Sequence, residues 1–492
     1  MEHAPATPKD HVHPWLRKIN LFFVPGQTTP LLEQVISGLL DTFRALGHNV
    51  QGQPDRHTDL LLATAPFARP LNWREAVMFT GRRRFGLSHT PTTLTLVHAR
   101  PGEFQKLMDH FENALAKDPV DPADFSFEGL VPTAYQTLVY QGLRGGPILA
   151  LERLLQTQAK SIRILLVVGE DEPQTAYLFD LVGAHPRIEA GDDNGFYKEI
   201  VLRTVTGLST HEVTGHQVAG GLIPHSLWRE LSTPAAMRVA SRELGQRGFF
   251  TQVVRVADMV QVPAVGHAVA EQYSEGCFAT WEPRLEALVA TITGSARPVD
   301  KDNITEDELA IITGVRPDGQ GAVIRHVENK RNDPPSSEAV EMIAMDQPLP
   351  RVPFDLETQG GRTTFQVPVA RSKLHGHRGV AAYHPGFVEY ASLDPPYYHY
   401  PVSCATEAQA NGIRQAFSRA QALLNPADPR QVVFTVLPGH GVVMVEKWQA
   451  GKAPFQVIWE YMDAGHLQIE ARVPQDWHTY EPAADGLHRL TE

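Results

Sequence analysis

The chain has 492 residues, 42% of them hydrophobic, and its 44 Lys and Arg against 56 Asp and Glu give a formal charge of −12. This composition excludes a disordered, collagen-like or coiled-coil chain. A negative charge without a polybasic run argues against nucleic acid as a partner, and the absence of an apolar run of ~20 residues argues against a membrane.

The only two cysteines, Cys277 and Cys404, cannot build a disulfide scaffold. The first residues also lack the apolar segment of a secretion signal. We therefore expect a protein of the reducing cytoplasm.

The first part of the chain alternates strand and helix patterns. Short apolar runs predict buried strands at 19–24, 60–65 and 93–98. After Thr29-Pro30, apolar residues at spacings of three and four predict a helix that ends at Gly47. A second helix pattern, over about 103–117, follows the third strand. This order predicts a parallel sheet with helices on both faces.

A second unit of the same kind follows a polar, proline-broken stretch at 118–130. Apolar runs predict strands at 162–168 and 249–256. Helical spacing from Leu285 to Ile292 predicts a helix that Glu282 caps. We read the polar stretch as a linker between two α/β units.

The sequence pattern changes after about residue 296 to charged turns and alternating strands. Hairpins are predicted from 432–437 with 442–446 and from 456–461 with 467–473, and one helix over about 406–424. Residues 334–337 (Pro-Pro-Ser-Ser) predict a mobile loop.

The predicted fold class is therefore α/β. Two consecutive open parallel-sheet α/β domains, at 1–120 and 121–300, precede a β-rich C-terminal domain with one helix at 301–492.

Histidines His375 and His377 form the most suggestive motif. On a strand, residues two apart point the same way, so both imidazoles could approach one metal ion or one edge of sugar hydroxyls. His384 lies nearby in a stretch rich in ligand-type side chains. An exposed loop of polar histidines explains the pattern equally well. A cupin site is excluded because Glu389 lies twelve residues beyond His377.

Two carboxylates are candidates for the edge of the second predicted sheet. Asp258 lies just past the predicted strand at 249–256, and Glu282 precedes the predicted helix. Carboxylates at the carboxyl edge of a parallel sheet could share a divalent cation. In the alternative interpretation, Glu282 only caps its helix, with Trp281 and Cys277 buried beside it.

Three further motifs carry less information. His440 lies between two glycines at a hairpin tip, where a backbone can approach a ligand closely or simply turn. His211 and His216 would point about 140° apart on a helix, which excludes the zinc helix motif H-E-x-x-H. Arg82-Arg83-Arg84 could hold a phosphate or a neighbouring subunit, but such clusters are usually solvated.

The order of the predicted domains resembles that of the L-fucose/L-arabinose isomerase-like proteins. A local resemblance to the same family comes from Cys277-Phe278-Ala279-Thr280-Trp281-Glu282 and the later Thr293-Gly294 turn. The detailed resemblance covers about 253–302. It implies a metal-dependent aldose–ketose isomerase that acts through an enediol, with a divalent metal such as Mn²⁺. It also implies a small sugar or related metabolite as substrate and a homo-oligomeric assembly.

The resemblance implies roles for particular residues. Glu282 and Asp258 would be the catalytic and metal-binding carboxylates, and the third ligand would come from a histidine. The candidates for that ligand are His375, His377 and His384. The candidates for sugar contact are Trp281, Tyr383 and His440.

Two other functions remain open. One is a carbohydrate- or metabolite-binding or assembly protein that keeps the fold without catalysis. The other is a metal-dependent hydrolase or lyase that uses His375 and His377. The last would keep its metal when Glu282 is changed and lose it when the histidines are changed.

Overall fold

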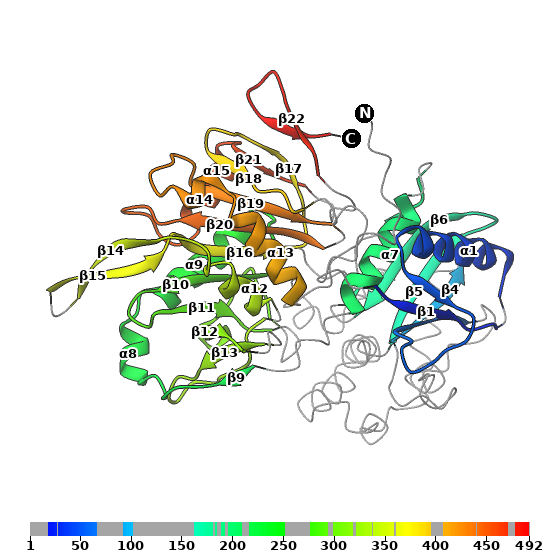
Figure 1. Ribbon diagram of the computed structural model, residues 1–492, viewed down its shortest axis with the longest axis horizontal. Helices are drawn as coiled ribbons and strands as arrows, with labels where there is room; N and C mark the ends of the chain where they lie inside the picture. Colours follow the sequence, from blue (N-terminus) through cyan, green and yellow to red (C-terminus); the bar gives the residue numbers. More distant parts are fainter. Residues whose placement is uncertain are drawn as a thin grey trace.

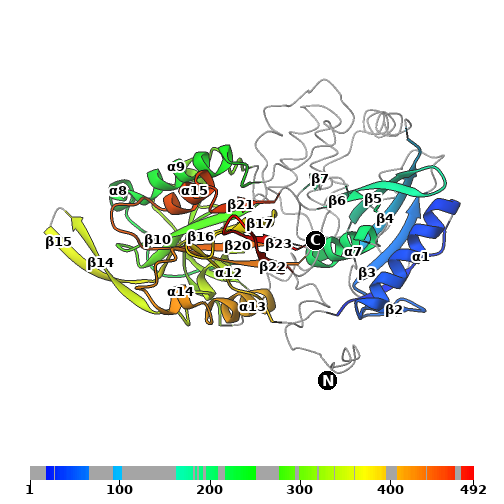
Figure 2. The ribbon, with the colours of Figure 1, turned by 90° about the horizontal axis from the view of Figure 1, so that it is seen from above.

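Two large sheets lie at opposite ends of the long axis of the molecule (Figures 1 and 2). This computed structural model describes residues 18–26, 28–65, 92–101, 162–180, 183–184, 188–191, 195–208, 216–250, 276–293, 299–317, 321–336, 338–358, 361–394, 407–438, 440–470 and 478–491. The described part of the chain contains mixed α/β sheets with parallel strands and eight α-helices, which is consistent with the α/β class predicted from the sequence. The predicted domain boundaries stay predictions.

The first sheet has eight strands, in the order β2-β1-β3-β4-β5-β6-β7, with β8 paired to β6. The pairings from β2 to β5 are parallel, and β6 runs antiparallel to β5. The strands are β1 (Asn20–Phe23), β2 (Asn49–Gln51), β3 (Leu60–Ala65), β4 (Thr92–Ala99), β5 (Ile162–Gly169), β6 (Pro173–Asp180), β7 (Gly183–Ala184) and β8 (Ile188–Glu189). The three strands predicted in the first unit are confirmed, and so is the strand predicted at 162–168. That strand, β5, was predicted in the second unit, but it pairs with β4 and belongs to the first sheet.

Two helices, α1 (Pro30–Ala45) and α7 (Gly195–Leu208), pack with this sheet around one apolar core. Helix α1 confirms the helix predicted after Thr29. The Thr29 hydroxyl caps it by accepting a hydrogen bond from the Leu32 backbone N–H at 3.3 Å. The helix predicted over 103–117 lies outside the described residues.

The second sheet has nine strands, in the order β18-β19-β20-β16-β10-β11-β12-β13-β9. All its pairings are antiparallel except β18 with β19 and β13 with β9. The strands are β9 (Gln217–Val218), β10 (Cys277–Glu282), β11 (Ala287–Thr291), β12 (Leu309–Val315), β13 (Ala322–Arg325), β16 (Ala370–Gly376), β18 (Val388–Tyr390), β19 (Val432–Leu437) and β20 (Gly441–Lys447). The predicted β19–β20 hairpin is confirmed.

Helices cover both faces of the nine-stranded sheet (Figure 2). On one face, side chains of α8 (His225–Glu230), α9 (Thr233–Gln246) and α15 (Gln456–Asp463) join the core. On the opposite face the core includes α12 (Ala339–Ala344), α13 (Glu407–Phe417) and α14 (Gln421–Leu424). The single helix predicted over 406–424 is thus broken into α13 and α14.

Two smaller sheets and a short helix complete the described structure. β14 (Arg351–Thr358) and β15 (Gly361–Pro368) form a ribbon that projects from the molecule (Figure 1). A four-stranded sheet contains β17 (Val380–Tyr383), β21 (Leu467–Ile469), β22 (Tyr480–Pro482) and β23 (His488–Leu490). A 3₁₀ helix spans Glu306–Glu308.

The helix predicted over 285–292 is wrong. β10 and β11 form an antiparallel hairpin, and the Leu285 N–H donates to the Glu282 carbonyl in its turn at 3.2 Å. All five residues of β11 are buried, so the strand is apolar toward both faces. A strand of that kind carries no alternation, and helical spacing arises in it by chance.

The predicted strand at 456–461 is also wrong, because these residues belong to helix α15. Strand β21 begins after it, at Leu467. Of the strand predicted at 249–256, only Phe249 and Phe250 are described; they are buried and lie outside any strand. The Ser336 N–H donates to the Thr291 carbonyl at 3.0 Å, which holds part of the predicted mobile loop against the end of β11.

Candidate functional site

Three histidines gather on the sheet face that α12 and α13 cover. One ring nitrogen from each of His375, His377 and His440 lies within 4.8 Å of the others. The ring centroids are 4.5 Å apart for His375 and His440, 5.0 Å for His377 and His440, and 5.1 Å for His375 and His377. His375 and His440 are buried, and His377 is half-buried. This group could hold a metal ion.

The backbone explains why these side chains meet. His375 lies on β16 and His377 just past its end, so both point to one face. His440 directly precedes β20, which pairs with β16. Gly441 has φ +152°, and a Cβ on it would lie 2.0 Å from the Gly376 carbonyl oxygen. Only glycine allows this approach of the two strands.

Two of the three imidazoles are held from outside the cluster. Nδ1 of His375 hydrogen-bonds the Val442 carbonyl oxygen at 3.1 Å. Nδ1 of His440 hydrogen-bonds the side-chain amide of Gln409, on α13, at 2.7 Å. Both contacts are buried. The Val442 carbonyl can only accept, so in a neutral ring the proton of His375 lies on Nδ1 and its Nε2 could bind a metal ion.

The charge state of His440 suits metal binding. Burial lowers its pKa well below the ordinary value, and positive charge on His375, His377 and Arg203 acts in the same direction. The imidazole is therefore neutral at pH 7, which is the form that binds metal. Arg203 lies on α7, beside the first sheet, and is itself buried.

Glu338 is the carboxylate beside this cluster. Burial alone would raise its pKa, but the charges of His375 and His377 and a hydrogen bond from the Ser336 hydroxyl outweigh burial, so its pKa lies below the ordinary value. It is only 8% exposed and directly precedes α12. A buried, ionised carboxylate near two of the three imidazoles is a candidate proton acceptor.

Cys277 and Lys301 extend this buried polar group. Cys277 is paired with His375 across β10 and β16. Burial raises the pKa of its thiol well above the ordinary value, and the charge of Glu338 adds to that rise. Burial lowers the pKa of Lys301 to about 8, although Cys277 and Glu338 oppose that shift. Lys301 donates to the Ile292 carbonyl at 2.8 Å.

The structure does not bring Glu282 to the histidines. Glu282 lies five residues beyond Cys277 on β10, so it is about 17 Å farther along the strand and points to the opposite face. Its carboxylate accepts hydrogen bonds from the Thr233 hydroxyl at 2.7 Å and the Arg284 N–H at 2.9 Å. It binds the β10–β11 turn to α9 and caps no helix of its own.

The remaining predicted residues lie elsewhere. Nδ1 of His384 accepts the Gly386 N–H at 3.1 Å, and the ring packs on Phe387. Tyr383 and Trp281 are buried in the apolar cores on opposite faces of the nine-stranded sheet. His440, predicted as a substrate contact, joins His375 and His377 instead.

Some candidates fall wholly or partly outside the described residues. Asp258, Arg82-Arg83-Arg84, His211 and Cys404 all lie outside them. His216 is described, and its Nδ1 accepts the Ala322 N–H at 3.1 Å.

Sequence reasoning missed Glu338 and Gln409. Glu338 stands at the end of a turn-rich segment, and Gln409 is one of several polar residues on α13. Neither has a spacing that connects it to His375 or His440. The only available signal was the position of Glu338 at a helix start, which is also typical of an ordinary cap.

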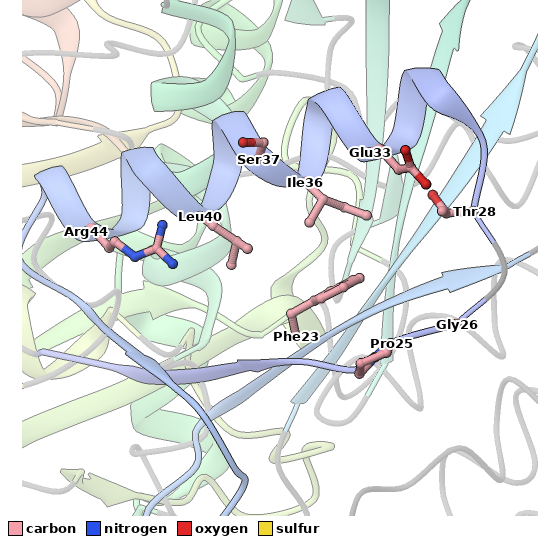
Figure 3. A pocket seen from close by; sticks show the side chains of 9 residues that line it. All are labelled: Phe23, Pro25, Gly26, Thr28, Glu33, Ile36, Ser37, Leu40 and Arg44. Carbon is pink, nitrogen blue, oxygen red and sulfur yellow. The ribbon is translucent and has the colours of Figure 1, made fainter.

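A separate hollow of about 430 Å³ lies between α1 and the end of β1 (Figure 3). Phe23, Ile36 and Leu40 supply its apolar wall, and Glu33 and Arg44 lie toward its two ends. No histidine or cysteine lines it. The hollow therefore lacks the chemical groups that make the histidine cluster the stronger candidate.

Comparison with protein families, curated proteins and solved structures finds no match to this chain. Among the described residues, no helix combines the length and the apolar composition needed to cross a bilayer.

Proposed function

We propose that this chain is a metal-dependent enzyme, a lyase or hydrolase, whose metal is held by His375, His377 and His440. The observation that carries the proposal is the convergence of three imidazole nitrogens within 4.8 Å on a buried sheet face. Three protein ligands leave a position for substrate or water, as catalytic zinc sites do.

The ligand set favours zinc over manganese, because imidazole suits zinc and other late transition metals, whereas manganese prefers oxygen ligands. When bound, such an ion polarises a carbonyl oxygen or activates water. The three histidines fix the ion, and the buried Glu338 takes or returns the proton that the reaction moves.

The histidine-based alternative is favoured over the sugar isomerase because of where Glu282 lies. The isomerase depended on Glu282 and Asp258. Glu282 has its own partners on the far face of the sheet, and Asp258 lies outside the described residues. Glu338 is a carboxylate close enough to His375 and His377 for their charges to lower its pKa.

The first test is metal content. We expect about one equivalent of zinc, or of cobalt in its place, in purified protein, lost in His375→Ala, His377→Ala and His440→Ala. Matched controls are His384→Ala and Glu282→Gln, which should retain the metal. Metal retained in all three histidine variants, or no metal in the unmodified protein, would reject the site and favour a non-catalytic binding protein.

The second test addresses the reaction. The protein is assayed with short hydroxyaldehydes and hydroxyketones for carbon–carbon cleavage, and with ester and amide substrates for hydrolysis. Glu338→Gln should keep the metal and lose about 10²-fold or more in turnover. Full turnover in this variant would remove Glu338 from the mechanism and leave the metal site standing.

A further inference from the structure

Gln409, on α13, hydrogen-bonds His440, one of the three proposed metal ligands. Its amide nitrogen Nε2 lies 2.7 Å from Nδ1 of His440. The side chain is fully buried on α13, one of the helices that cover one face of the nine-stranded sheet (Figure 2). The contact therefore joins the helix layer to the candidate metal site.

The chemistry of imidazole decides what this contact does. A neutral ring that binds metal through Nε2 carries its proton on Nδ1, and that N–H needs an acceptor. Rotation of the Gln409 amide by half a turn exchanges its oxygen and nitrogen at nearly the same positions. The amide oxygen then accepts the Nδ1 proton of His440.

His375 shows the arrangement that metal binding through Nε2 requires. There the acceptor is the Val442 carbonyl, at 3.1 Å from Nδ1. Val442 belongs to β20, and its backbone carbonyl holds the His375 ring. Gln409 belongs to α13, and its side chain holds the His440 ring. Only the second can be altered by substitution without changing the sheet.

We propose that Gln409 is a positioning residue for the metal site, which holds His440 in the ring orientation and tautomer that bind a divalent ion through Nε2. This inference rests on the proposed metal site and goes beyond it, because it assigns a role to α13. Gln409 does not touch the ion. It acts only through His440.

The test compares Gln409→Leu, which removes the acceptor, with Gln409→Glu, which keeps an oxygen acceptor at that position. Gln415→Leu, on the same helix, is the matched control. The probes are Zn²⁺ and Co²⁺ alone, added to metal-stripped full-length protein. Three quantities are measured: the Kd by chelator competition, the visible absorption of bound Co²⁺, and the melting temperature without metal.

We expect Gln409→Leu to weaken Zn²⁺ binding about 10- to 100-fold, the usual effect of losing such a partner, and to change the Co²⁺ spectrum. Gln409→Glu should restore the affinity to within a few-fold of the unmodified protein. Gln415→Leu should leave both the affinity and the spectrum unchanged.

A purely structural hydrogen bond would give a different result. Gln409→Leu would then lower the metal-free melting temperature without moving the Kd, and that outcome overturns the inference while leaving the proposed metal site intact. If the unmodified protein binds neither ion, both fail together. If Gln409→Leu does not fold, Gln409→Glu decides, because a loss of affinity there contradicts the role of an oxygen acceptor.

Discussion

Raising the pH should weaken the attachment of α15 to the nine-stranded sheet, because the carboxyl group that caps this helix titrates near neutrality. Glu446, on β20, is 1% exposed. Its oxygens accept the backbone N–H groups of Phe455 at 2.8 Å and Val457 at 2.9 Å. Burial raises its pKa from 4.5 to about 7, although the charge of Arg371 and these backbone hydrogen bonds oppose the rise.

The sign follows from proton binding. Between pH 4.5 and 7 the folded protein holds the Glu446 proton and the unfolded chain releases it, so stability is greatest at low pH and falls as the pH rises. One pH unit is worth about 1.4 kcal/mol, so the loss across this window is ~3 kcal/mol. The loss is complete above about pH 7.

Hydrogen exchange at the amides of α15, measured at pH 5 and pH 8 and corrected for the chemical exchange rate, reports this loss. The unmodified protein should show an opening free energy about 3 kcal/mol lower at the higher pH. Glu446→Gln cannot titrate, so its opening free energy should not change with pH, though its amide nitrogen faces N–H donors and weakens the helix at both values.

The exposed Glu481→Gln is the matched control and should keep the pH dependence. Equal pH dependence in Glu446→Gln and the unmodified protein would refute the reasoning. It would mean that another group controls the opening of α15.

Three other predictions concern stability and the site. Gly441→Ala places a Cβ 2.0 Å from the Gly376 carbonyl oxygen. We therefore expect the free energy of unfolding to fall by at least ~2 kcal/mol and the bound metal to be lost. Unchanged metal content would show that the site does not depend on the close approach of Gly441 to Gly376. Burial, with a smaller effect from a nearby lysine, lowers the pKa of His48 from 6.5 to about 4. The free energy of unfolding should therefore fall by ~3 kcal/mol as the pH drops from 6.5 to 4, as measured by hydrogen exchange in the first sheet. The substitution His48→Gln should remove this pH dependence. The buried nitrogen of Lys373 lies 2.6 Å from the Asp346 carboxylate, and Lys373→Met removes this cation. We expect the free energy of unfolding in urea to fall by ~3–5 kcal/mol and to recover in large part when Asp346→Leu is added. If Lys373→Met is as stable as the unmodified protein, the ion pair is dispensable.

The sequence predicts helix α1 and four of the eight strands of the first sheet, β1, β3, β4 and β5, because their signals are local. The Thr29 cap and the apolar face of α1 lie within one short segment, and runs such as 60–65 are bounded by polar turns. Each strand of a parallel sheet is one continuous apolar run. Such patterns can be recognised without knowing what lies beside them.

The second sheet is harder to predict because distant residues decide its elements. Helix α15 is capped by Glu446 rather than by a residue next to it, and it starts after Phe455 with φ +67°. Ala287–Thr291 is apolar on both faces, which hides the period of a strand. In both cases the deciding contact is far away in the sequence.

The candidate site shows the same division. The spacing of His375 and His377 places both on one face, and this part of the prediction agrees with the cluster. His440 reaches them through the β16–β20 register, which no local pattern specifies. Glu338 directly precedes α12, in a segment whose sequence is typical of an ordinary helix start. The carboxylate of Glu282 instead accepts the Arg284 N–H in the β10–β11 turn.

The strands that carry the histidines have consequences for how an ion would enter. β16 is hydrogen-bonded to β10 on one side and β20 on the other, and β20 to β16 and β19. Interior strands of this kind open only at nearly the full cost of unfolding. An incoming ion would therefore find its ligands already assembled, unlike the small domains that fold around zinc. Chelation should empty the site and leave the surrounding architecture in place.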